Sequence, residues 1–159
     1  MPKQNITYEQ AIVKAMRLCS KGEKCTDDIR KKLLQWGIEQ QNISSVIEQL
    51  KKERFIDDER FAMLFAQSKV RQNKWGKIKI GYAMKQKKLP GDVINKSLDK
   101  IDEQEYKAIL ANELRKKFHS LQHIEDAYKI KNKLIQYALN KGFENNIVHE
   151  AIASMIKNY

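Results

Sequence analysis

The sequence predicts an all-α protein of three tandem three-helix repeats that form an elongated, curved array. Three observations favour this fold class. Apolar residues recur at helical spacing in most segments, and one arrangement of apolar positions recurs three times along the chain. Strand signals are nearly absent, because the chain has no Asn-Gly or Asp-Gly turn and its only prolines are Pro2 and Pro90.

The repeat is clearest when Gly37, Lys88 and Gly142 are aligned. Lys88 lies 51 residues after Gly37, and Gly142 lies 54 residues after Lys88. In this register six sets of apolar residues coincide over the second and third helices: Ile29, Ile80 and Leu134; Leu33, Met84 and Ala138; Ile38, Leu89 and Phe143; Ile43, Ile94 and Val148; Ile47, Leu98 and Ile152; and Leu50, Ile101 and Met155. Each repeat is expected to bury a small core and to pack against its neighbour.

These alignments divide the chain into residues 1–56, 57–101 and 102–159. The first repeat opens with a capping box from Thr7 to Gln10, and Thr26 is expected to cap its second helix. Ile29, Leu33 and Leu34 are expected to form the apolar face of that helix. Gly37 is expected to be a left-handed C-cap.

The second and third repeats begin alike. Ile56-Asp57 precedes Phe61, and Ile101-Asp102 precedes Tyr106, so each pair predicts a hydrophobic staple around an N-cap. Glu105 is expected to complete a capping box in the third repeat. Asp57 and Asp58 lie at a helix start, where carboxylates are expected to cap the helix. This role is favoured over the alternatives, in which they hold Mg²⁺ or act as a general base.

Composition narrows the class of protein. The 159 residues carry a net charge of +11, which points to nucleic acid, an acidic protein surface or, more weakly, anionic lipid as partner. No window has the length and apolarity of a membrane span, and the N-terminus lacks the apolar run of a signal peptide. A cytoplasmic protein without membrane contact is therefore expected, and we expect it to be monomeric.

Residues suited to catalysis or metal binding are sparse. Cys19 and Cys25 are interpreted as reduced thiols, with a redox pair as the alternative. His119 and His123 have helical spacing but no HExxH motif or nearby thiol, so surface histidines are favoured over a metal site. Nucleotide-binding glycine motifs are also missing. No enzyme activity, metal or cofactor is therefore predicted.

The middle of the chain carries the strongest functional signal. From Phe61 to Gly91 there is no Asp or Glu, and uncompensated charge on a folded domain is destabilising, so an anionic ligand is expected there. The candidate DNA- or filament-binding residues are Lys69, Arg71, Lys74, Trp75, Lys77, Lys79, Lys85, Lys87 and Lys88. A helix N-terminus near Gly76 would add amide donors for an anion. Trp75 would stack on a base or a partner side chain. The alternative makes Trp75 a lid on the core and the lysines a solvated face.

The stretch Phe55-Ile56-Asp57-Asp58-Glu59-Arg60-Phe61-Ala62, followed by Arg71, Gly76 and Ile80, resembles the RecX regulatory proteins. Upstream similarity includes Ala11, Leu18, Ser20, Leu33, Gly37-Ile38, Val46-Ile47 and Leu50. The resemblance covers nearly the whole chain and is weakest in the third repeat. Lys88 departs from a pattern that often has Gly. Asp57, Asp58, Arg60, Phe61 and Ala62 are carried over as motif residues with a mainly structural role.

The resemblance implies tandem three-helix repeats and a cytoplasmic modulator of the RecA recombinase. Such a protein would lie along the RecA–single-stranded DNA filament, with inhibition of ATPase, recombinase and co-protease activity as the expected direction, and thereby affect DNA repair, recombination and the SOS response. It would bind single-stranded DNA, with double-stranded DNA as a further candidate.

Two alternatives remain open. One is a DNA-binding protein that acts without RecA; its contacts would be independent of base sequence, because the third helices offer few base-reading side chains. The other is a helical scaffold for a different acidic protein.

Overall fold

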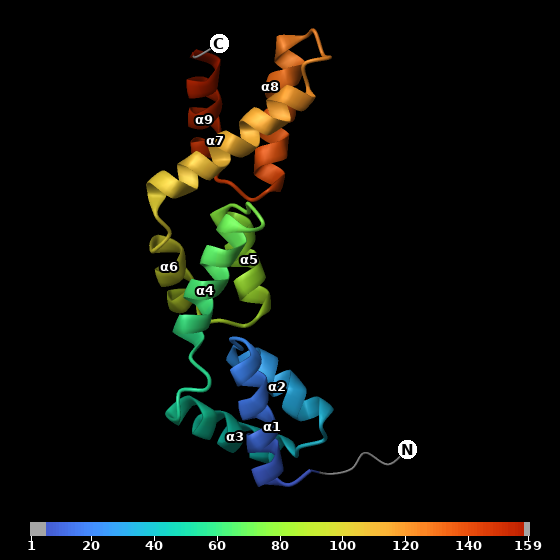
Figure 1. The fold of residues 1–159 in the computed structure, drawn as a ribbon, viewed down its shortest axis with the longest axis vertical. Helices are drawn as coiled ribbons and strands as arrows, with labels where there is room; N and C mark the ends of the chain where they lie inside the picture. Colours follow the sequence, from blue (N-terminus) through green and yellow to red (C-terminus); the bar gives the residue numbers. More distant parts are fainter. Residues whose placement is uncertain (1–5, 158–159) are drawn as a thin grey trace.

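The computed structural model describes residues 6–157, and in this range it contains nine α-helices and no strand (Figure 1). The helices are α1 (Tyr8–Lys21), α2 (Thr26–Gln35), α3 (Gln40–Lys52), α4 (Asp58–Arg71), α5 (Lys77–Gln86), α6 (Gly91–Asp99), α7 (Glu103–Ser120), α8 (Ala127–Asn140) and α9 (Asn145–Lys157). They form three groups of three along one long axis. The all-α class and the tandem three-helix array are confirmed.

The backbone confirms the alignment of the repeats at the turn between their second and third helices. Gly37, Lys88 and Gly142 have φ values of 82°, 59° and 92°. In each turn the following amide donates to a carbonyl of the preceding helix: Ile38 to Leu33 (3.1 Å), Leu89 to Met84 (3.3 Å) and Phe143 to Ala138 (3.2 Å). This is the Schellman arrangement, which satisfies carbonyls at a helix end and favours glycine at the left-handed residue. Lys88 adopts that conformation with a side chain.

Three of the four predicted N-caps, Thr7, Asp57 and Asp102, are found. Thr7 forms the capping box with Gln10, and Asp57 accepts a hydrogen bond from the amide of Arg60 at 3.0 Å. Asp102 likewise accepts from the first turn of α7, but the Glu105 side chain binds Arg71 in place of completing a capping box.

Two expectations for α2 are wrong. Its N-cap is Cys25, because Thr26 is already helical and its hydroxyl donates to Asp58 at 2.8 Å. Leu34 is 49% exposed and does not join the apolar face with Ile29 and Leu33.

The buried residues form two cores, where three small ones were expected. The first repeat encloses its own cluster, which includes Ile29, Val46 and Leu50. The second and third repeats share a single cluster that runs from Phe61 to Ile152 and also contains Cys25 of the first repeat. The joint between the second and third repeats is therefore apolar at its centre, whereas side-chain ion pairs and hydrogen bonds dominate the joint between the first and second.

Candidate nucleic-acid interface at the repeat junctions

The second repeat meets the third where the α4–α5 turn contacts the α8–α9 turn. The amide of Gly76 donates to the carbonyl oxygen of Lys141 at 2.7 Å, and that of Ile78 donates to Gly142 at 3.0 Å. Between them, the Lys77 amide donates to the Tyr106 hydroxyl at 2.9 Å, and that hydroxyl donates to Glu144. Burial and the hydrogen bond to Glu144 raise the pKa of Tyr106, so the phenol stays protonated.

This contact contradicts one part of the predicted anion site. The amides at the start of α5 were expected to face an anion, but three of them already donate to the third repeat. The backbones come this close because both residues at the contact are glycines. A Cβ on Gly76 would lie 2.2 Å from the carbonyl carbon of Gly142. Gly76 and the α5 N-terminus therefore hold the repeats together.

Ion pairs cross both junctions, and at each junction the second repeat supplies the cation and its neighbour supplies the carboxylate. At the first junction, acids of the first repeat meet bases of the second: Glu23 with Arg60 (2.7 Å), Asp28 with Lys87 (3.1 Å) and Asp27 with Lys88 (4.0 Å). At the second junction, Arg71 of the second repeat donates to both carboxylate oxygens of Glu105 in the third, at 2.7 and 3.2 Å. The hydrogen bond from Arg71 holds the pKa of Glu105 below its ordinary value.

These pairs change the interpretation of residues 61–91, the stretch without Asp or Glu. Arg71, Lys87 and Lys88 were expected to lack counter-charges, and this is wrong: their partners come from the neighbouring repeats. Sequence proximity could not reveal those partners. Part of the positive charge in the second repeat therefore serves the assembly of the array.

Trp75 lies beside the second junction, partly buried against the shared core. The ammonium groups of Lys69 and Lys79 lie 5.0 and 4.6 Å from its ring centroid. Such contacts are attractive because the ring face is electron-rich. The packing matches the alternative in which Trp75 covers the core, and the surface above it presents cations.

A matching cluster lies across the junction. The ammonium groups of Lys117 and Lys141 lie 5.3 and 5.7 Å from the ring centroid of Tyr137. The Tyr137 hydroxyl donates to Glu113 at 2.9 Å, and Lys141 lies 3.3 Å from the same carboxylate. Burial alone would raise the pKa of Glu113, but these two contacts outweigh it and hold the pKa below its ordinary value.

Lys141 connects the two clusters, because its ammonium lies 3.5 Å from the carbonyl oxygen of Asn73, in the turn that carries Trp75. We call Lys69, Lys79, Lys117 and Lys141 the junction lysines. Among the residues that the structure describes, Lys69, Lys79 and Lys117 have no ion-pair partner. The sequence did not single out Tyr137 or Lys141, since only the packing of two repeats brings them near Trp75.

The remaining predicted lysines, Lys74, Lys77 and Lys85, lie away from the Trp75 ring contacts. Lys74 adopts a positive φ of 57° and donates to the carbonyl of Arg71, while the Lys77 ammonium lies 5.1 Å from the ring centroid of Tyr106. Lys85 borders a groove between α5 and α6. Lys69 and Lys79 thus lie at Trp75. Lys77 lies over Tyr106 of the third repeat and lines the same groove as Lys85, while Lys74 lies in the α4–α5 turn.

The motif residues contribute to structure at the start of α4. Phe61 and Ala62 are 7% and 0% exposed within the shared core. Asp58 accepts from both the amide and the hydroxyl of Thr26 at 2.8 Å, so it caps α2 from the neighbouring repeat. Arg60 also donates to the carbonyl of Arg54 at 3.2 Å.

Neither a metal-binding cluster nor a membrane-spanning helix is found in residues 6–157. This range holds no group of three or more His, Cys, Asp or Glu side chains placed to hold a metal ion. None of its helices combines the length and the apolarity needed to cross a bilayer.

Known proteins resemble this chain in sequence and in fold. Residues 57–98 match the model of the RecX second three-helix domain, and residues 103–152 match that of the third. "Regulatory protein RecX" of Clostridium botulinum strain Eklund 17B is 32% identical over 156 residues, which cover 95% of this chain and 73% of the relative. That of Clostridium acetobutylicum is 32% identical over 148 residues, or 91% and 68% of the two chains.

A solved structure supports the architecture. The crystal structure of RecX from Lactobacillus salivarius superposes with a TM-score of 0.86 at 18% identity, over 92% of this chain and 95% of that one. At this identity the match shows the fold. Together with the sequence matches, it leads to one conclusion: the chain belongs to the RecX family of regulatory proteins.

Proposed function

We propose that this protein binds the RecA–single-stranded DNA filament and inhibits its ATPase, recombinase and co-protease activities. In this proposal it acts in the cytoplasm as a monomer, has no catalytic activity, metal or cofactor, and also binds single- and double-stranded DNA. The observation that carries the proposal is the similarity, over nearly the whole chain, to curated RecX regulatory proteins. We also propose residues 1–56, 57–101 and 102–159 as the repeats, and the grouping of helix contacts supports these limits.

The junction lysines support the nucleic-acid part of the proposal. Lys69, Lys79 and Lys117 project from α4, α5 and α7, and they hold ammonium groups over aromatic rings beside one junction. Lysines without counter-charges gain most from phosphate contacts, because no intramolecular ion pair must first be broken. Of the nine candidates named from the sequence, we retain Lys69 and Lys79 as primary DNA contacts. Lys74, Lys77 and Lys85 remain secondary candidates.

The proposal is tested by two measurements on one variant. Replacing Lys69, Lys79 and Lys117 by Ala is expected to weaken single-stranded DNA binding and to flatten its salt dependence. If all three contact phosphates, the slope of log K against log salt changes by about 2. The protein should inhibit RecA ATPase on single-stranded DNA, and the variant should inhibit less.

The matched control replaces Arg30, Lys32 and Lys52, which are exposed and lie in the first repeat. It changes the net charge equally and should bind DNA as the wild type does. Equal slopes for both variants would contradict the assignment of the junction lysines. A wild-type protein that leaves RecA ATPase unchanged at excess would contradict the RecA part.

DNA binding without RecA is the second candidate function, and the unpaired junction lysines favour it independently of the family. Binding to unrelated DNA sequences with equal affinity, without any effect on RecA ATPase, would select this candidate.

A further inference from the structure

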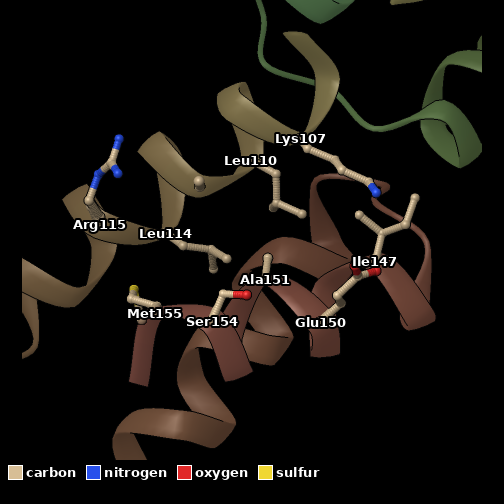
Figure 2. A pocket seen from close by; sticks show the side chains of 10 residues that line it. Lys107, Leu110, Leu114, Arg115, Ile147, Glu150, Ala151, Ser154 and Met155 are labelled. Atoms are coloured by element: carbon tan, nitrogen blue, oxygen red, sulfur yellow. The ribbon is translucent and has the colours of Figure 1, made fainter. Parts of the chain in front are cut away.

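A groove in the third repeat lies between α7 and α9 (Figure 2). The face of α7 that borders it differs from the face that contacts Tyr137 of α8. It has a volume of about 460 Å³. Leu110 and Leu114 of α7 form its buried floor, and Ile147, Ala151 and Met155 of α9 line the opposite wall. Glu113 and Lys117, which contact Tyr137 of α8, point to another side of α7. The groove is therefore separate from the junction lysines.

The repeat alignment shows that this space is closed in the second repeat. Tyr106 aligns with Phe61, and Val148 aligns with Ile94. In this alignment Ala111 is equivalent to Ala66, and Ala151 is equivalent to Ser97. Ala66 and Ser97 are 0% and 3% exposed, whereas Ala111 and Ala151 are both partly exposed. The same pair of small side chains is covered in one repeat and accessible in the next. A side chain from outside the third repeat can therefore enter between its helices.

The rim of the groove carries charge on its α7 side. Lys107 and Arg115 lie at its two ends, eight residues and so about 12 Å apart along α7. Lys107 is paired with Glu103 at 3.4 Å, but Arg115 is exposed and has no ion-pair partner in the described part of the chain. Glu150 and Ser154 are the polar residues on the α9 side.

The residues that line and border the groove limit the kind of molecule that can occupy it. An aliphatic floor gives phosphates no hydrogen-bond donors, so nucleic acid is disfavoured. A second copy of the chain is disfavoured because each copy carries a net charge of +11. Two helices that expose an apolar stripe about two turns long match the apolar face of a third helix. Cations at both ends of the groove, Lys107 and the unpaired Arg115, favour carboxylates on that helix.

We propose that the α7–α9 groove docks an amphipathic helix of a protein partner. The helix places aliphatic side chains between Leu114 and Ala151 and carboxylates beside Lys107 and Arg115. The inference rests on the proposed function in one respect, namely that the protein binds a protein partner in addition to DNA.

The test uses a synthetic helical peptide of about 15 residues with Leu on one face and Glu two turns apart. Its twin carries Lys in place of Glu. In methyl NMR titrations, the acidic peptide is expected to shift the methyl signals of Leu110, Leu114, Ile147 and Met155, and the Lys twin to bind at least about tenfold more weakly. Absence of these shifts, or equal binding of both peptides, overturns the proposal.

Groove-filling and charge-reversal variants locate the site. Ala151→Leu should lower peptide affinity about tenfold by filling the groove, while Ala153→Leu, the same change at an exposed position of α9, should not. Arg115→Glu should weaken binding of the acidic peptide more than Lys133→Glu on α8 does, which provides a test even if Ala151→Leu unfolds. Equal affinities within either pair overturn the proposal. RecA is absent from these titrations, so their failure is distinct from a failure of the ATPase assay.

Discussion

Gly76→Ala should uncouple the second repeat from the third. The added Cβ would lie 2.2 Å from both the carbonyl carbon of Gly142 and the amide nitrogen of Phe143. Both neighbours are backbone atoms, so no side-chain rotation relieves the clash. Ordinary contact begins at 3.4 Å, and the α4–α5 turn must therefore move by about 1.2 Å.

A movement of this size has a calculable effect. The hydrogen bonds from Gly76 to Lys141 (2.7 Å) and from Ile78 to Gly142 (3.0 Å) would lengthen beyond the range of useful geometry. Each contributes about 1 kcal/mol, and more if its donor remains buried without an acceptor. Phe143, which is 0% exposed, would also lose packing. We expect the free energy of unfolding to fall by about 3 kcal/mol.

Urea denaturation followed by circular dichroism measures the change, and Gly81→Ala provides the control in the same helix. A Cβ at Gly81 would lie 3.5 Å from a Leu98 methyl group, an ordinary contact, so this variant should be more stable by about 1 kcal/mol through helix propensity. If Gly76→Ala unfolds within about 0.5 kcal/mol of the wild type, the close approach of the two turns is refuted.

Three further outcomes follow from the structure. Lys88→Gly should stabilise the protein by up to about 1 kcal/mol in urea denaturation, because it relieves a left-handed residue with φ 59°; a clear loss of stability would contradict this. Burial raises the pKa of the Cys25 thiol to about 11, so iodoacetamide at pH 8 should alkylate Cys25 only after unfolding, as peptide mass spectrometry can show; rapid labelling of native Cys25 would refute its burial. Hydrogen bonds from Cys25 and Lys87 outweigh burial and lower the pKa of Asp28. The stability that ionised Asp28 contributes is therefore present above about pH 4 and is lost as the pH falls through the folded-state pKa. Asp28→Asn should reduce this loss of stability in acid, and an unchanged dependence of unfolding free energy on pH would contradict the pairing of Asp28 with Lys87.

The sequence predicted what depends on local periodicity. The left-handed C-cap at Gly37 followed from residue type, and one alignment placed Lys88 and Gly142 at the same point of their repeats, where the backbone is also left-handed. The cap at Asp57 followed from residue type and spacing. These features depend on a few consecutive residues, which a sequence displays directly.

Contacts between repeats could not be predicted in the same way. Thr26 had the side chain of an N-cap, yet Asp58, 32 residues later, uses it as a hydrogen-bond donor. The joining of Tyr137 and Lys141 to the Trp75 cluster likewise depends on how two repeats stack. Opposite charges far apart in sequence have many possible partners, and only the packing of the turns selects among them.

The polarity of the two junctions limits which repeat can follow which. The second repeat presents Arg60, Lys87 and Lys88 to one neighbour and Arg71 to the other, so it is cationic at both ends. A duplicate of this unit stacked on itself would bring like charges together and would lack the acids that each contact needs. The second repeat therefore opposes the uncontrolled end-to-end addition of further copies, which is the hazard of open helical assemblies. In this way, the ion pairs at each end of the middle repeat require a neighbour that supplies carboxylates.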